Sequence, residues 1–135
     1  MTAYPPVQRD NSSAGFFDAA QRRQLQMKCS ESGVVLRPQA STDPDDLSAP
    51  LQPVIVSGDG TLVTWSVVHQ APHPALADSV PYVSAVVELA EGPWLIVRLL
   101  ADAEQLTVGA KLRVRFERTG SEDDRGEVVP VFELA

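Results

Sequence analysis

Hydrophobic and polar residues alternate along most of the chain beyond residue 53, and a period of two residues indicates β-strands. The first predicted strand is short and the other five are long, with turns rich in Gly and Pro between them. Residues 101–106, after the third long strand, have a helix-forming composition with Asp102 as cap and Gly109 beyond the end. This layout predicts a mainly β protein with a five-stranded OB-fold barrel. The predicted strands are Pro53–Ser57, Thr61–His69, Tyr82–Leu89, Trp94–Leu100, Lys111–Arg118 and Glu127–Glu133.

The N-terminal part follows a different pattern. Residues 1–11 contain two prolines and no apolar period, which predicts a mobile arm or a segment ordered by a partner. A helix is expected next, with Ser12 or Ser13 as its cap and residues 21–24 facing water. Its approximate apolar stripe consists of Phe16, Phe17, Ala20 and Leu25.

Two short strands, Leu25–Cys29 and Val34–Arg37, are predicted to form a hairpin around the turn 30–33. The segment 39–53 carries three prolines and three aspartates and is predicted to be a loop. We therefore divide the chain into an arm (1–11), a helix with a hairpin (12–52) and a barrel (53–135). The 135 residues are enough for one hydrophobic core.

The formal net charge of −7 argues against nucleic-acid binding, which depends on Lys and Arg neutralising phosphates. The basic residues 111, 113 and 115 alternate with apolar ones, so they indicate the solvated face of one strand. Trp65 alternates in the same way with Val63 and Val67 and is expected in the core. A single cysteine excludes an internal disulfide, and there is no apolar leader and no stretch of the roughly 20 apolar residues that span a bilayer. We expect a cytoplasmic protein without membrane contact.

Candidate catalytic and metal-binding groups are few. His69 and His73 have a spacing that a helix could use for zinc, but the prolines around His73 forbid that helix and no third ligand is near in sequence. Cys29 has no recognisable base, and Gly58-Asp59-Gly60 precedes a strand, which favours a hairpin turn over a phosphate loop. The carboxylates 122–124 lie in a predicted solvated turn. We therefore expect neither a catalytic residue nor a metal ligand, and no enzymatic activity of the chain alone.

Several short segments, spread from about Phe16 to Phe132, follow one another in a distinctive order. They are Phe16-Phe17, Leu25–Cys29, Ser57-Gly58-Asp59-Gly60-Thr61, Trp65-Ser66-Val67-Val68-His69, Pro81-Tyr82-Val83, Val87-Glu88-Leu89, Glu91-Gly92, Val108-Gly109, Leu112-Arg113-Val114 and Pro130-Val131-Phe132. No single segment is specific, but their order and spacing are. In that order and spacing the chain resembles the DUF35 family, whose members combine a rubredoxin-like zinc ribbon with an OB fold and are associated with acyl-CoA chemistry.

The chain departs from the family at the zinc site. The family's ribbon holds zinc with two CxxC knuckles, because a structural site needs four tetrahedral N or S ligands. Here the first knuckle reads Cys29-Ser30-Glu31-Ser32, and the region of the second, Ser41-Thr42-Asp43-Pro44, has no cysteine. The ribbon is therefore expected to be degenerate and metal-free, stabilised by packing or by a partner.

The resemblance implies a non-catalytic accessory subunit of a thiolase-like or lipid-transfer-protein-type enzyme that acts on acyl-CoA thioesters. Such assemblies include aldolases of steroid side-chain breakdown, thiolases and acyltransferases. The partner is then a catalytic subunit in a hetero-oligomer, and acyl-CoA is the substrate of that complex while this chain binds no cofactor directly. The residues assigned to the partner interface are Phe16, Phe17, Trp65, His69 and Tyr82.

Two other functions stay open. The chain could be a stand-alone acyl-CoA or lipid-binding OB module, which co-expression with a thiolase-like neighbour would distinguish from a subunit. An oligonucleotide-binding OB fold is disfavoured by the negative charge. The two phenylalanines also permit a simpler interpretation, because helix geometry allows both rings to be buried inside this chain.

Overall fold

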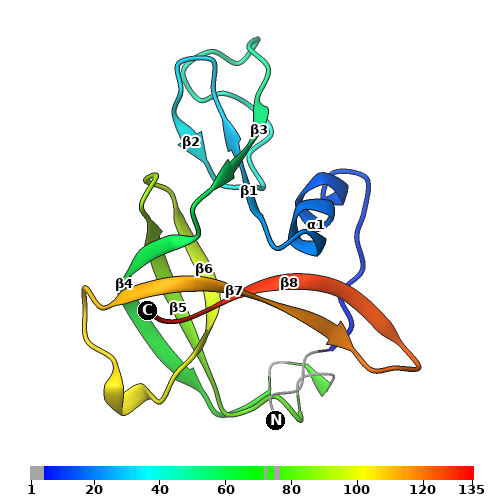
Figure 1. Ribbon diagram of the computed structural model, residues 1–135, viewed down its shortest axis with the longest axis vertical. Helices are drawn as coiled ribbons and strands as arrows, with labels where there is room; N and C mark the ends of the chain where they lie inside the picture. The colour runs from blue at the N-terminus through cyan, green and yellow to red at the C-terminus, as the bar shows by residue number, and fades with distance from the viewer. Residues whose placement is uncertain (1–4, 72, 75–76) are drawn as a thin grey trace.

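The chain forms a small sheet and a closed barrel, joined end to end (Figure 1). The computed structural model describes residues 5–71, 73–74 and 77–135. The predicted mainly β fold with an N-terminal helix and an OB-like barrel is confirmed. The elements are α1 (Ala14–Gln21), β1 (Leu25–Cys29), β2 (Val35–Leu36), β3 (Gln52–Val56), β4 (Asp59–Val68), β5 (Tyr82–Leu89), β6 (Trp94–Leu100), the 3-10 turn η2 (Ala103–Gln105), β7 (Lys111–Gly120) and β8 (Arg125–Leu134).

The barrel closes in the strand order β4-β5-β6-β8-β7. Its neighbours are antiparallel except β6 and β8, which pair in parallel at Leu99–Phe132 and Leu100–Glu133. A shift of register between Leu62 and Thr64 lets both Leu62 and Trp65 contact the core despite their odd spacing. The predicted alternation, which placed Val63 on the same face as Trp65, is therefore wrong at Val63, because a pattern with a fixed period of two cannot predict a bulge.

The small sheet has the order β2-β1-β3. The predicted hairpin is present, with Cys29 paired to Val35. The strand predicted at 53–57 also forms, but it pairs with β1 rather than with a barrel strand, from Leu25–Val56 to Cys29–Gln52. The change from one sheet to the other thus occurs between β3 and β4, a few residues after the expected division at residue 53.

The two ends of helix α1 differ in how the chain enters and leaves the helix, and the predicted serine cap does not form. Ser13 occupies the cap position, but its hydroxyl makes no bond to the first turn and instead donates to Asp10 Oδ1, 2.8 Å away. Arg23 adopts a left-handed φ of 63°, which ends the helix and turns the chain into β1. Leu25, predicted on the helix stripe, is therefore the first residue of β1. Residues 21–24 are exposed as expected.

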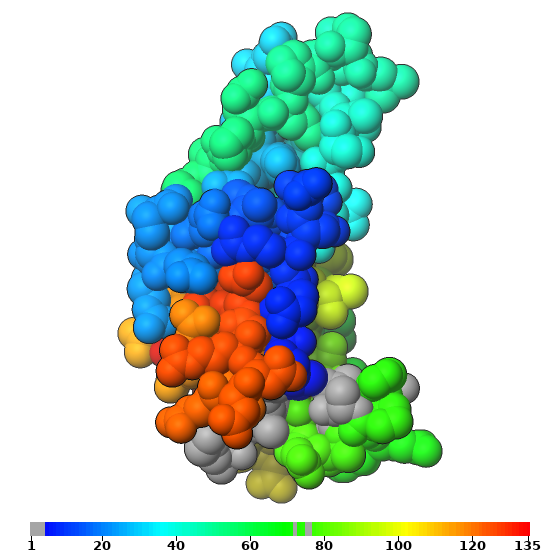
Figure 2. Space-filling model, turned by 90° about the vertical axis from the view of Figure 1, so that its right-hand side faces the viewer, coloured from blue at the N-terminus to red at the C-terminus, as the bar shows by residue number. Residues whose placement is uncertain are grey.

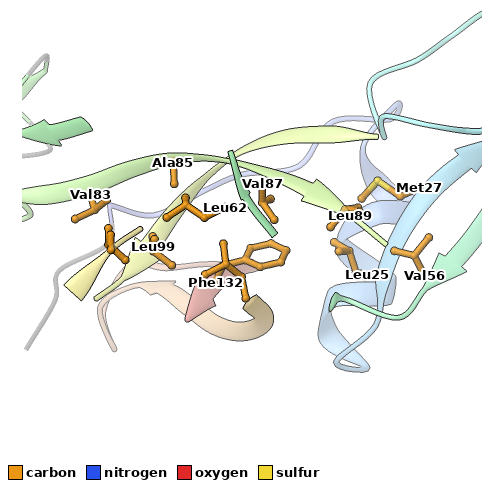
Figure 3. Close-up of a cluster of buried hydrophobic side chains, with 12 residues drawn as sticks. Leu25, Met27, Val56, Leu62, Val83, Ala85, Val87, Leu89, Leu99 and Phe132 are labelled. Carbon is orange, nitrogen blue, oxygen red and sulfur yellow. The ribbon is translucent and has the colours of Figure 1, made fainter. Parts of the chain in front are cut away.

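One continuous core runs through the junction of the two sheets (Figure 3). Leu25 and Met27 of β1 and Val56 of β3 belong to the same buried cluster as Leu89 and Phe132 of the barrel. Phe132 is completely buried. Apolar contacts therefore hold the small sheet against one end of the barrel.

Residues 5–11, part of the predicted mobile arm, lie along β8 (Figure 2). The carbonyl of Val7 accepts a bond from Glu127 N at 2.7 Å, and Val7 N donates to Thr119 Oγ1 at 2.9 Å. In this part of the arm, the barrel supplies contacts that the sequence did not indicate.

Candidate partner-binding surface

A groove of about 800 Å³ lies between the small sheet and the barrel. One wall comes from β2 and the loop that follows it, and the other from the β5–β6 hairpin. Figure 1 shows these two elements on the same side of the molecule. The lining residues are Val35, Leu36, Arg37, Gln39, Ala40, Ser41, Thr42, Pro44, Val86, Pro93, Trp94, Leu95 and Ile96.

Two large hydrophobic side chains on the outer face of β6 are exposed at this groove. Ile96 is 81% exposed and Trp94 is 53% exposed. Val86 of β5 lies opposite Ile96 in the ladder, and the indole Nε1 of Trp94 donates to Glu88 Oε2 at 2.7 Å. An exposed cluster of this kind, with an aromatic ring and a polar rim, is typical of a protein contact surface.

The outer face of β7 has the opposite character. Arg113 and Arg115 are exposed there, as the alternation predicted, and both form ion pairs. Arg115 Nε lies 2.6 Å from Glu117 Oε1, and Arg113 Nε lies 3.4 Å from Glu133 Oε1. Neighbouring carboxylates thus offset these two cations, which favours a solvated face over a phosphate-binding one.

The structure places Phe16 and Phe17 mainly inside the molecule. Their rings meet edge to face, with centroids 5.3 Å apart. Phe17 is buried, and Phe16 is half-buried and packs against the core cluster. Trp65 is also half-buried against that cluster. Much of the surface of these three rings is therefore buried by contacts within the chain.

His69 and Tyr82 lie elsewhere, where β4 ends and β5 begins, away from the groove. His69 is exposed. The ring of Tyr82 is covered by the guanidinium of Arg98, 4.5 Å from the ring centroid. The five residues assigned to the interface from the sequence are thus not brought together on one surface.

Trp94 and Ile96 were missed, although the sequence carries a signal for them. The run Trp94-Leu95-Ile96-Val97 has large apolar side chains at both odd and even positions. A barrel strand with a solvated outer face should alternate with polar residues. An apolar outer face on such a strand indicates a surface that something covers.

The residues at the degenerate ribbon do not fit a structural zinc ion. Hydrogen bonds close both turns where the family has its knuckles: Ser30 Oγ accepts from Val34 N at 3.1 Å, and Asp43 Oδ1 accepts from Asp45 N at 3.0 Å. Cys29 Sγ lies 3.4 Å from the carbonyl oxygen of Ser30. Among the residues described, no three His, Cys, Asp or Glu side chains are placed to share a metal ion.

The remaining candidate groups are solvent-facing or part of the connection between the sheets. His73 and the carboxylates 122–124 are exposed. The Gly58–Gly60 segment leads from β3 into a strand, β4, and not into a helix, but β3 and β4 belong to different sheets, so the predicted hairpin turn is wrong and the segment connects the two sheets. Within the described part of the chain, no helix has the length and apolar character that crossing a membrane requires.

Comparison with known proteins agrees with this architecture. Residues 53–117 match the family described as ChsH2, C-terminal OB-fold domain. A protein named "Probable enoyl-CoA hydratase alpha subunit" from Thermomonospora curvata is 34% identical over 107 residues, which cover 78% of this chain and 32% of that protein. The chain therefore spans about a third of this larger relative.

Two further proteins are similar over most of their own length. A "DUF35 domain-containing scaffold protein" from Methanocaldococcus jannaschii is 28% identical over 104 residues, which cover 76% of this chain and 73% of that protein. The solved structure named "Ltp2-ChsH2(DUF35) aldolase" superposes with a TM-score of 0.77 at 27% identity, covering 93% of this chain and 96% of the matched chain. With its N-terminal helix, three-stranded sheet and OB-like barrel, this chain belongs to the DUF35 family.

Proposed function

We propose that this chain is a non-catalytic subunit that binds a catalytic partner acting on acyl-CoA thioesters, and that the groove around Trp94 and Ile96 is its docking surface. The observation that carries the proposal is the exposure of these two side chains on a surface shared by the small sheet and the barrel. Burying both side chains against a partner would supply the aromatic and aliphatic anchors that dominate many interfaces.

The similar proteins support a role in an assembly. One is named a scaffold protein and another is the DUF35 component of a two-protein aldolase. We therefore propose a hetero-oligomer whose catalytic subunit is of the thiolase-like or lipid-transfer type, located in the cytoplasm. The hydration chemistry in the name of the Thermomonospora relative belongs to a longer protein and is not proposed for this chain.

In this proposal the chain shapes or supports the partner's active site while the partner supplies the reacting groups. Acyl-CoA is then bound by the complex. The alternative, a stand-alone acyl-CoA or lipid-binding module, differs in one measurable respect, because it requires affinity for acyl-CoA without the partner.

Co-expression with the thiolase-like protein encoded nearest to this chain, followed by size-exclusion chromatography, tests the proposal. We expect a stable complex, and neither turnover nor acyl-CoA binding by the isolated chain. Acyl-CoA binding by the isolated chain with no complex formed would favour the stand-alone module.

A charged substitution locates the interface. Ile96→Asp should weaken the complex at least about thirtyfold, equivalent to about 2 kcal/mol, because a charge would be buried against the partner. Asp123→Ala, in the exposed β7–β8 turn, is the control and should leave affinity unchanged. Phe16→Ala is compared in the same assay, and a larger loss there than at Ile96, with the fold intact by thermal melting, would move the interface to α1.

A further inference from the structure

We propose that the N-terminal arm is a clasp that fixes α1, and with it the small sheet, on the barrel, and so holds the two walls of the groove at a set distance. The clasp consists of residues 5–10. Its effect on partner binding rests on the function proposed above, whereas its effect on the position of α1 does not.

Arg9 connects two elements that are far apart in sequence. Its Nε and Nη2 donate to the two carboxylate oxygens of Glu127 on β8, at 2.7 and 3.0 Å. Its Nη1 donates to Asp18 Oδ1 on α1 at 2.6 Å. The planar guanidinium therefore holds the helix and the barrel in one orientation, because a bidentate pair restricts direction as well as distance.

The barrel is shaped to receive the arm at Gly126. A methyl group at this position would overlap Val7 N, Thr119 Oγ1 and Pro6 Cα. The backbones of the arm and of β8 approach so closely that only hydrogen fits between them. At this approach Val7 N donates to Thr119 Oγ1 and the carbonyl of Val7 accepts from Glu127 N, so backbone hydrogen bonds hold the arm independently of the charge on Arg9.

The clasp is connected to the groove only indirectly, through α1 and the small sheet. Helix α1 leads directly into β1, β1 pairs with β2, and β2 forms one wall of the groove. Arg23, at the end of α1, adds a further bond to the barrel, from Nη1 to the carbonyl of Phe116 at 2.8 Å. The apolar contacts at the junction are non-directional, whereas these polar contacts also restrict the orientation of α1 and of the sheet that follows it.

Hydrogen exchange on the isolated chain tests the clasp without the partner. Arg9→Ala removes the charged contacts and Gly126→Ala displaces the arm by its methyl group, so both should speed amide exchange in α1 by about tenfold or more. Exchange in β5 should rise much less than in α1 in both variants. The matched control is Arg22→Ala, since Arg22 is exposed and its Nε donates to the neighbouring Gln24.

Unchanged exchange in α1 in both variants would overturn the clasp. A cooperative thermal melt, together with exchange in β5 that rises much less than in α1, shows that the barrel is folded. With the partner present, both variants should weaken the complex about threefold to tenfold, as expected when coupling acts through orientation. Faster exchange without any loss of affinity would overturn the link to the groove. If no complex forms with the parent chain, the proposed function fails while the exchange result still decides the clasp.

Discussion

Thr119 shows how much of this fold depends on single buried polar groups. Its side chain is 2% exposed, and its hydroxyl accepts from Val7 N and donates to the carbonyl of Glu127 at 2.7 Å. A buried hydroxyl is tolerated when it is paired in this way. The same residue lies at the register shift of the β7–β8 ladder, where the arm meets the barrel.

Thr119→Val should therefore destabilise the protein by about 1–3 kcal/mol, because Val7 N and the carbonyl of Glu127 both lose a partner. Urea unfolding measures the change. Thr107→Val is the control, since Thr107 is exposed, and it should change the free energy of unfolding little. Equal effects at the two positions would contradict the role of the Thr119 hydroxyl.

Glu127 makes the stability of the clasp depend on pH. Its pKa lies below the ordinary value for Glu, because the side chain accepts hydrogen bonds from Arg9, an effect that exceeds the opposing one of burial. The nearby Arg118 adds attraction in the same direction. Since the pKa is lower in the folded state, the contribution is present above the unfolded-state pKa and is lost as pH falls through the folded-state value.

We expect Glu127→Gln to lower the melting temperature near neutral pH and to lower it less at an acidic pH below the folded-state pKa of Glu127, because the parent carboxylate is protonated there. Melting curves at several pH values measure this. Glu122→Gln in the exposed turn provides the comparison. A loss at Glu127 that is the same at both pH values would mean that the carboxylate charge is not the cause.

At the scale of elements, the small sheet keeps the ribbon's hairpin without the ribbon's metal ligands. Ser30 is buried, and its hydroxyl also lies 2.9 Å from Ser32 Oγ. The backbone N of Ser30 donates to the carbonyl of Val34 at 2.9 Å. Hydrogen bonds thus close the turn that a pair of thiolates and zinc closes in a rubredoxin-like ribbon.

Ser30→Ala should weaken this turn by about 1 kcal/mol, because Val34 N loses its acceptor in a part-buried hydrogen bond. Faster amide exchange at Val34 and in β2 would report it. Ser48→Ala, at an exposed loop position, is the matched control. Stability and exchange that do not change in Ser30→Ala would show that packing alone holds the hairpin.

For the whole molecule, the shared core predicts that the small sheet and the barrel unfold together. Phe132 lies in the cluster that also contains Leu25, Met27 and Val56 from the small sheet. Apolar burial is cooperative across such a junction, since opening either part exposes surface of the other.

Phe132→Ala should cost about 3–5 kcal/mol through the cavity it leaves. Tryptophan fluorescence, which reports on the barrel, and amide exchange in β1 should then shift by the same free energy. Val108→Ala is the control, because Val108 is 74% exposed. Loss of stability in the barrel while β1 keeps its protection would show that the two parts unfold independently.

Much of this architecture follows from local pattern. The bounds of β1, β5 and β6 agree with those predicted, because strand periodicity depends on residues that are neighbours in sequence. The order of the family's segments and the missing cysteines were also visible in the chain, and the family assignment followed from them. Local chemistry likewise indicated the turn at Ser30 and the solvated face of β7.

Other features depend on contacts between distant residues. Three examples are the pairing of β3 with β1, the bulge at Val63 and the contact of the arm with Gly126. In each case neither segment's sequence indicates that the other segment contacts it. The candidate site belongs to this group. The run from Trp94 to Val97 places apolar side chains on both faces of the strand, but closure of the barrel decides which face of β6 is covered and which is exposed, so only the folded chain singles out Ile96 as a binding candidate.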